Sequence, residues 1–399
     1  MVRTAAVLVA VALMSAACTA APDAPTETSD GDVADVAPGP AHAGGVTLPP
    51  PDELPETDLE TRIVDLDDVV FNTFDGRFLR LSDADPEQIE RLRDAIPPIE
   101  RPRYVSPEEV TVLGDDGLVL GVVAANGQPY AYPITILNFH EIVNEVLADV
   151  PVLISYCPLC RSGVVFHREL DGQVLTFGNT SALFDNDLVM YDHQTNSYWW
   201  QLAGRGIVGE LSGAELAVLP STTMPFGQWR EQHPDTLVMS TDTGFERPYG
   251  QNVFAGYRER VNAGQLPFPI AGEGLDDDRL DAGEEVLGVV LEEDARAYPL
   301  RLLGDAVVND TVGGQPLAVF TLEEGPSGRV FDRVLDGQTL TFELEGDRIV
   351  DRETGSVWTP AGRATEGELA GTQLVELASR TSFWFAFASA FPDVEVATP

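Results

Sequence analysis

Two stretches of the chain resemble each other, and this internal similarity restricts the fold more than any other feature of the sequence. Gly121-Val-Val followed by Ala131-Tyr-Pro recurs as Gly288-Val-Val followed by Ala297-Tyr-Pro, and residues 164–177 recur as 329–342. A further set keeps the same spacing in both stretches: Asp192, Thr195, Ser197 and Trp199 match Asp351, Thr354, Ser356 and Trp358. Matches that recur in the same order predict a tandem duplication.

Each copy consists of short apolar runs separated by two-residue turns. Ala148-Asp149 is the expected turn between strands over 142–147 and 150–156, and Gly313-Gly314 takes its place in the second copy. Asp171-Gly172 and Asp336-Gly337 mark a further pair of hairpins. Hairpins at this spacing predict a mostly β fold with a few short helices, in which each copy is a hairpin-built, sandwich-like or barrel-like unit.

The repeats and the composition between them predict five regions. These are a signal segment over 1–18, an acidic tether rich in Pro and Ala over 19–60, a first repeat over 61–239, a connecting segment over 240–281 and a degenerate second repeat over 282–399. The tether contains few large apolar residues, so it cannot bury a core of its own. A helix is expected from the Asp85-Pro86 cap to about residue 95, and a short aromatic helix should end each copy.

The first 18 residues are typical of an export signal. Arg3 precedes an apolar run over 5–14, and three small residues then lead to Cys18. This pattern is similar to a bacterial lipoprotein cleavage site, in which Cys18 would be lipidated and anchor the protein to a membrane. Ordinary secretion with cleavage nearby is the alternative. Both predict an exported protein, and a lipoprotein would lie in the cell envelope, on the outer face of the membrane or in the periplasm.

The charge balance excludes one class of partner. The chain has 65 acidic residues against 24 basic ones, all of them Arg, and a formal charge of −41. Such a surface repels the phosphates of nucleic acid, so we expect no nucleic-acid partner.

Cys157 and Cys160 form the one C-x-x-C pair, in the run Tyr-Cys-Pro-Leu-Cys-Arg. Because Arg161 and no His follows, the pair does not predict covalent haem. If Ala148-Asp149 is a hairpin turn, His140 lies opposite Cys157, at a distance that suits two ligands of one ion. The pattern therefore predicts a Cys₂His metal site of His140, Cys157 and Cys160, for zinc or copper, with a fourth position open.

Two other uses of the cysteines stay open at this stage. They could be a thiol–disulfide redox pair in which Arg161 lowers a thiol pKa, or a static disulfide in a non-enzymatic surface protein. Glu141 is a candidate acid or base beside the site, and His193 is a weaker candidate ligand. The second copy carries Asp305, Leu322 and Gly325 at the corresponding positions, so it cannot form the same site.

Several motifs together resemble one family. These are His140-Glu-Ile-Val-Asn, Tyr156-Cys-Pro-Leu-Cys160, Met190-Tyr-Asp192, Arg247-Pro-Tyr-Gly, Pro267-Phe-Pro, Asp278-Arg-Leu and Val286-Leu-Gly. Over about residues 63–392 the chain resembles the bacterial and archaeal domain of unknown function 3179. Arg161 and His167 depart from the usual family pattern. The resemblance supports the position of the site and implies no activity.

Overall fold

The computed structural model describes residues 54–322 and 327–397, and it is mostly β, as the turn pattern predicts. The predicted signal segment with Cys18, and most of the predicted tether, lie outside the described residues. No helix in the described part of the chain is both long and apolar enough to cross a bilayer. The helices are α2 (Pro86–Leu92), α3 (Ile134–His140), α4 (Phe226–Gln232), α5 (Tyr257–Asn262), α6 (Leu300–Leu303) and α7 (Trp384–Ala390), with short 3-10 turns η2 (Leu81–Asp83), η3 (Pro107–Glu109) and η4 (Glu273–Leu275).

We call residues 61–239 the first half of the molecule and residues 282–397 the second half. One sheet contains strands of both halves, in the order β30-β19-β18-β29-β8-β7-β6, and β15 pairs with β8 beside it. Its first-half strands are β6 (Ile142–Leu147), β7 (Val150–Cys157), β8 (Ser162–His167) and β15 (Val218–Leu219). Its second-half strands are β18 (Glu285–Leu291), β19 (Asp294–Pro299), β29 (Arg380–Phe383) and β30 (Glu395–Val396). Strand β29 joins the halves, because it pairs with β18 on one side and reaches Gly163 of β8 through Thr381.

The other first-half strands form two sheets. A six-stranded sheet has the order β14-β13-β12-β11-β1-β2, and a five-stranded sheet has the order β16-β4-β5-β17-β3. Their bounds are β1 (Val69–Asn72), β2 (Phe78–Arg80), β3 (Tyr104–Val105), β4 (Leu118–Val123), β5 (Pro129–Pro133), β11 (Phe177–Phe184), β12 (Asp187–Asp192), β13 (Tyr198–Trp200), β14 (Arg205–Val208), β16 (Thr222–Pro225) and β17 (Leu237–Met239). β9 (Glu169–Leu170) and β10 (Gln173–Val174) form a separate two-stranded ribbon.

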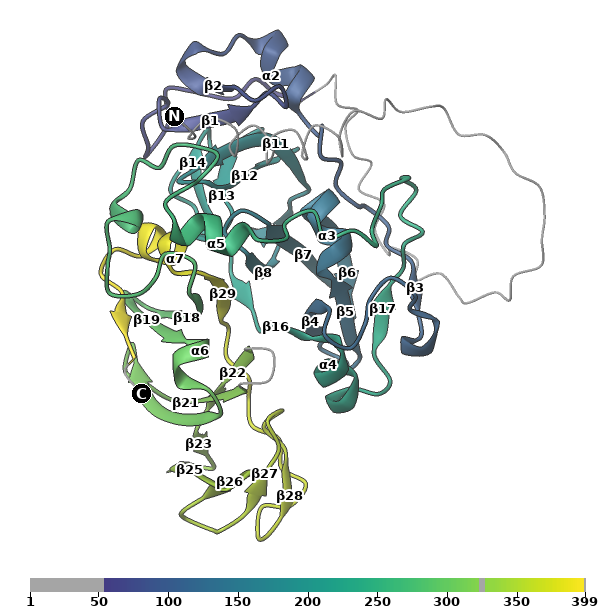
Figure 1. Cartoon of the computed structure of the whole chain (residues 1–399), viewed down its shortest axis with the longest axis vertical. Helices are drawn as coiled ribbons and strands as arrows, with labels where there is room; N and C mark the ends of the chain where they lie inside the picture. Colours follow the sequence, from purple (N-terminus) through teal and green to yellow (C-terminus); the bar gives the residue numbers. More distant parts are fainter. Residues whose placement is uncertain (1–53, 323–326, 398–399) are drawn as a thin grey trace, which may run out of the picture.

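The second half has smaller sheets of the same kind. Three strands follow the order β20-β21-β22, four follow β25-β26-β27-β28, and β23 pairs with β24. Their bounds are β20 (Ala306–Val312), β21 (Gln315–Leu322), β22 (Ser327–Asp332), β23 (Val334–Leu335), β24 (Gln338–Thr339), β25 (Phe342–Glu345), β26 (Arg348–Asp351), β27 (Val357–Trp358) and β28 (Ala364–Glu366). Figure 1 shows β25–β28 at one end of the molecule and β1, β2 and α2 at the opposite end.

The expected hairpins are confirmed. Ala148-Asp149 turns between the paired residues Leu147 and Val150, and Gly313-Gly314 turns between Val312 and Gln315. Asp85 caps α2 as expected, but the helix ends at Leu92, before residue 95. α4 and α7 are the two short helices expected near the ends of the two predicted copies.

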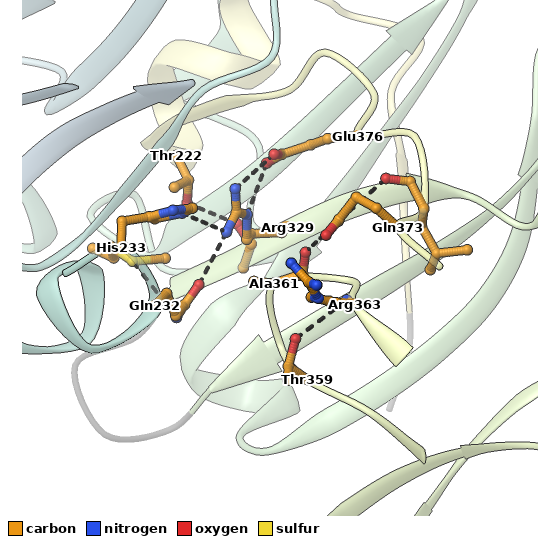
Figure 2. Close-up of polar contacts among 12 residues, drawn as sticks. Thr222, Gln232, His233, Arg329, Thr359, Ala361, Arg363, Gln373 and Glu376 are labelled. Carbon is orange, nitrogen blue, oxygen red and sulfur yellow. Dashed lines mark hydrogen bonds and ion pairs between the residues drawn. The ribbon is translucent and has the colours of Figure 1, made fainter. Parts of the chain in front are cut away.

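A buried arginine ties the halves together at a second place (Figure 2). Arg329 of β22 donates two hydrogen bonds to Glu376, at 2.9 and 2.7 Å, and one to Gln232 at the end of α4, at 2.9 Å. His233 lies beside the same guanidinium, and burial lowers the pKa of its imidazole to about 4. The guanidinium therefore supplies a charged contact between α4 of the first half and the second half.

Candidate metal centre

The two cysteines lie where β7 turns into β8. Cys157 is the last residue of β7 and pairs with Ser162 of β8, while Cys160 lies in the turn between them. Arg161 adopts a left-handed φ of 53° just before β8 begins. Both sulfur atoms point inward, are buried, and stand 3.1 Å apart as free thiols. The turn between β7 and β8 thus brings two soft donor atoms, the two sulfurs, close together.

Asp187 is the third member of the group. It is the first residue of β12, directly after the turn Asp185-Asn186, and its Oδ1 lies 2.8 Å from Cys160 Sγ. The donor atoms of Cys157, Cys160 and Asp187 all lie within 4.8 Å of one another, and all three residues are buried. Two sulfurs and one carboxylate oxygen at this spacing could hold a metal ion.

Neighbouring groups fix the orientation of Asp187. Its Oδ2 accepts a hydrogen bond of 2.8 Å from the main-chain N–H of Leu202, so Oδ1 is left to face the sulfurs. The Ser162 hydroxyl lies 3.5 Å from Oδ1 and donates to Gln201, whose amide in turn donates to Ser155. A carboxylate held in this way is positioned before any ion arrives.

Burial determines the protonation of the group. Burial raises the pKa of the Asp187 carboxyl to about 6 and raises the pKa of both thiols, that of Cys160 well above its usual range. Because burial disfavours negative charge, both sulfurs stay protonated while no cation is present. Binding a cation would displace these protons, and the bonds from the ion to the sulfur and oxygen atoms would offset the free-energy cost of deprotonation.

Glu141 lies close to the group and is only half-buried. It ends α3 in a left-handed conformation, with a φ of 59°, and its Oε2 accepts a hydrogen bond of 2.7 Å from Asn179. Burial, and secondarily the charge of Asp187, raise the pKa of the Glu141 carboxyl to about 8. Glu141 is therefore a neighbour of the three donors and not one of them.

The structure does not bring His140 to the cysteines. The expected register holds from Leu147–Val150 to Ile142–Ser155 and goes no further, because residues 134–140 form α3 and the left-handed Glu141 turns the chain out of the ladder. His140 Nδ1 lies 2.8 Å from the Pro97 carbonyl oxygen, and Nε2 lies 2.6 Å from the Tyr249 hydroxyl. In the described structure Asp187, and not His140, lies with the two cysteines, whereas the sequence predicts a Cys₂His set.

The remaining candidates lie outside the group. Arg161 forms an ion pair of 2.5 Å with Glu285, and the thiol pKa values are raised instead of lowered. His193 stacks on Tyr191 with ring centres 5.2 Å apart, and neither of its buried ring nitrogens has a hydrogen-bond partner among the described residues. Burial lowers the pKa of His193 to about 4, so its imidazole is neutral at physiological pH.

Comparison of the two halves contains the signal that would have identified Asp187. The β11–β12 hairpin, from Phe177 to Asp192, is six residues longer than its counterpart from Phe342 to Asp351, and each hairpin pairs its own first and last residues. Asp185 and Asn186 form the tip of the longer hairpin, and Asp187 follows directly as the first residue of β12. Polar residues in an insertion that only the cysteine-bearing half contains are the expected source of a further ligand.

The family model described as "Protein of unknown function (DUF3179)" matches residues 93–394, and the chain belongs to this family. No curated protein and no solved structure matches the chain.

Proposed function

We propose that this member of the DUF3179 family binds one metal ion, most favourably zinc, through Cys157, Cys160 and Asp187. The observation that carries the proposal is the convergence of three buried donor atoms within 4.8 Å, two of them from the end of β7 and the turn after it and one from the start of β12. Two thiolates and a carboxylate can be buried side by side only when a cation compensates their charge.

The donor types favour zinc over copper. Zinc accepts thiolate and carboxylate ligands together, and its usual bond lengths are about 2.3 Å to sulfur and about 2.1 Å to oxygen. Copper(I), the form that thiolates select, gains little from a carboxylate oxygen. Asp187 is therefore the ligand that would favour zinc over copper(I).

A thiol–disulfide redox role is the second candidate, favoured by the 3.1 Å between the sulfurs and by the carboxylate beside Cys160. Exchange with another protein requires a thiolate to attack an accessible sulfur. Cys157 is 1% exposed and Cys160 0% exposed, so only a small species reaches them without an opening of the fold. The burial supports an ion over a protein partner.

We further propose that the protein is exported and anchored to a membrane through a lipid on Cys18, and that the site belongs to the first of two duplicated units. The apolar run ahead of Cys18 supports export. The repeated motifs, and hydrogen bonds that recur at matched positions, support the duplication. The metal site would then be a property of one unit alone.

Titration of the purified full-length chain with zinc against a colorimetric chelator tests the proposed function. We expect one zinc per chain, with both thiols protected from alkylation while the metal is bound. Cys157→Ser and Asp187→Asn should each lose tight binding, whereas copper(I) binding should depend on the cysteines and hardly on Asp187.

Asp351→Asn is the matched control, because Asp351 is a buried carboxylate of the second half that accepts hydrogen bonds from Thr354 and Trp358. It should keep the zinc stoichiometry. Absence of zinc binding by the reduced wild-type chain would contradict the proposal. A disulfide that forms and is reduced reversibly, without any metal binding, would favour the redox role.

A further inference from the structure

We infer that the main-chain oxygen of Asn186 is the fourth ligand, so that the proposed metal ion is fully enclosed by protein and has no position open to solvent or substrate. This inference rests on the proposed metal binding and deepens it, since it decides whether the ion is held as a cross-link or used for chemistry. The three donors alone would leave one tetrahedral position vacant.

The distances support this oxygen. Asn186 O lies 3.5 Å from Cys160 Sγ and 4.0 Å from Cys157 Sγ, on the side of the sulfurs where Asp187 also lies. In a tetrahedral zinc site, bond lengths of about 2.3 Å to sulfur and 2.1 Å to oxygen place neighbouring sulfur and oxygen ligands about 3.6 Å apart. The observed separations lie on either side of that value.

The hairpin turn explains why Asn186 presents its carbonyl oxygen. Asp185 and Asn186 both have positive φ, of 50° and 60°, as the two central residues of a tight turn between Phe184 and Asp187. Asn and Asp tolerate this conformation better than other non-glycine residues. The same turn delivers the Asn186 carbonyl and the Asp187 carboxylate to the cysteines from consecutive residues.

The segment between the two halves closes the site from outside. Asp185 Oδ1 accepts hydrogen bonds from the main-chain N–H groups of Ala271 and Gly272, at 2.7 and 2.8 Å. The Asn186 amide donates to the Tyr257 hydroxyl at 3.3 Å. Tyr257, with Val261 and Phe268, belongs to the same apolar cluster as the two cysteines.

This cover leaves little room for an outside ligand. A Cβ at Gly272 would come within 2.6 Å of the Asp185 side chain, so the loop segment around Gly272 lies in close contact with the Asp185-Asn186 turn. Asn186 itself is 0% exposed. A metal ion at this point is surrounded by donors and apolar side chains, the arrangement of a structural site.

Cobalt(II) substitution tests the inference, because its visible absorption reports coordination number and responds to added ligands. The full-length chain loaded with cobalt should show the strong bands of a four-coordinate site with sulfur ligands. Azide or imidazole added in excess should leave these bands unchanged. A shift on adding either ligand would show an open position and overturn the inference, while the proposed metal binding would stand.

Asn186→Gly separates the main-chain oxygen from the side chain. Glycine adopts a positive φ without penalty and keeps the carbonyl, so the affinity for cobalt should stay within about threefold of the wild type. Asn196→Gly, a change at another left-handed asparagine, with φ 54°, is the matched control. A loss of tenfold or more in Asn186→Gly alone would assign the ligand to the side chain and overturn the inference. Failure of the wild type to bind cobalt at all would instead contradict the proposed function.

Discussion

Two regions of the molecule can be compared: the one around β7, β8, β11 and β12 in the first half, and the one around β21, β22, β25 and β26 in the second half. The hydrogen bonds that hold the hairpins recur in both regions. In the part of the chain that the structure describes, the side chains that could bind a metal do not recur. In the first region Asp192 accepts hydrogen bonds from Thr195 and from the Trp199 indole, and in the second Asp351 accepts them from Thr354 and Trp358. Among the described residues, the one group that could bind a metal lies in the first region.

A second pair of hydrogen bonds also recurs in both regions. Asn144 exchanges two hydrogen bonds with the main chain of Phe177, and Asn309 exchanges the same two with Phe342. Leu322 and Ala306 stand where the first half has Cys157 and Glu141. Contacts that hold the hairpins in place are thus common to both regions, and the chemistry is confined to one.

The largest effect is expected from exchanging the donors themselves. Cys160→Ser should weaken zinc binding by about 100-fold or more, because each of four ligands carries roughly a quarter of a binding free energy of about 10–16 kcal/mol. Leu322→Ser changes the matched strand end of the second half and should leave zinc binding intact. Competition titration with a chelator measures both. Equal losses in the two variants would remove the distinction between the regions.

The shared aspartates should matter for stability and not for the metal. Asp351→Ala leaves the Trp358 indole and the Thr354 hydroxyl without their acceptor in a buried place. We expect a loss of about 3 kcal/mol in the free energy of unfolding. Urea denaturation measures it, with zinc content as the second readout. Loss of zinc from this variant would show that the second region supports the site.

Glu141 should make stability depend on pH, and Ala306 in the matched position cannot. Its pKa is raised from 4.5 to about 8, chiefly by burial, so the folded state binds more protons than the unfolded state between these values. The contribution of Glu141 to the free energy of unfolding should therefore be greatest below pH 4.5 and should fall as the pH rises towards 8. Because the side chain is half-buried, we expect a loss of about 2 kcal/mol after allowance for solvent screening.

Glu141→Gln removes the titrating group and should flatten this part of the profile. Urea denaturation of the metal-free protein at several pH values measures the slope. A profile in Glu141→Gln as steep as that of the wild type would assign the effect to another buried acid. Glu100, whose pKa burial raises to about 7, titrates in the same direction, and Glu100→Gln is the variant to compare.

The smallest effect is expected at His140. Its ring nitrogens contact the Pro97 carbonyl and the Tyr249 hydroxyl, so His140→Gln should cost about 1 kcal/mol of stability. The zinc stoichiometry should not change. Zinc loss in this variant, at full folding by circular dichroism, would restore the Cys₂His set that the hairpin register predicts.

Much of the fold follows from the sequence because the two-residue turns set the hairpin registers. Ala148-Asp149 and Asp171-Gly172 occupy the turns that their composition predicts. The cysteine pair follows from the sequence for a similar reason, since a C-x-x-C pair at a strand end brings its sulfurs together by local geometry alone.

The rest depends on contacts that no local pattern encodes. α3 is buried on several sides through Ile136, Leu137 and Phe139, and its N-cap Pro133 provides no side-chain cap, so neither amphipathic periodicity nor a capping signal marks it. This hidden helix removes His140 from the ladder. Asp187 reaches Cys160 across 27 positions of sequence, through the packing of one hairpin tip on another hairpin's turn.

X-ray absorption at the zinc edge of the loaded full-length chain tests the central claim most directly. We expect two sulfur neighbours at about 2.3 Å and oxygen neighbours at about 2.0–2.2 Å, without the outer-shell scattering of an imidazole ring. In Cys157→Ser, loaded with zinc at a concentration high enough to offset its weakened binding, the sulfur shell should be reduced to one. Two sulfurs with clear imidazole scattering, or a zinc ion without any sulfur neighbour, would contradict it.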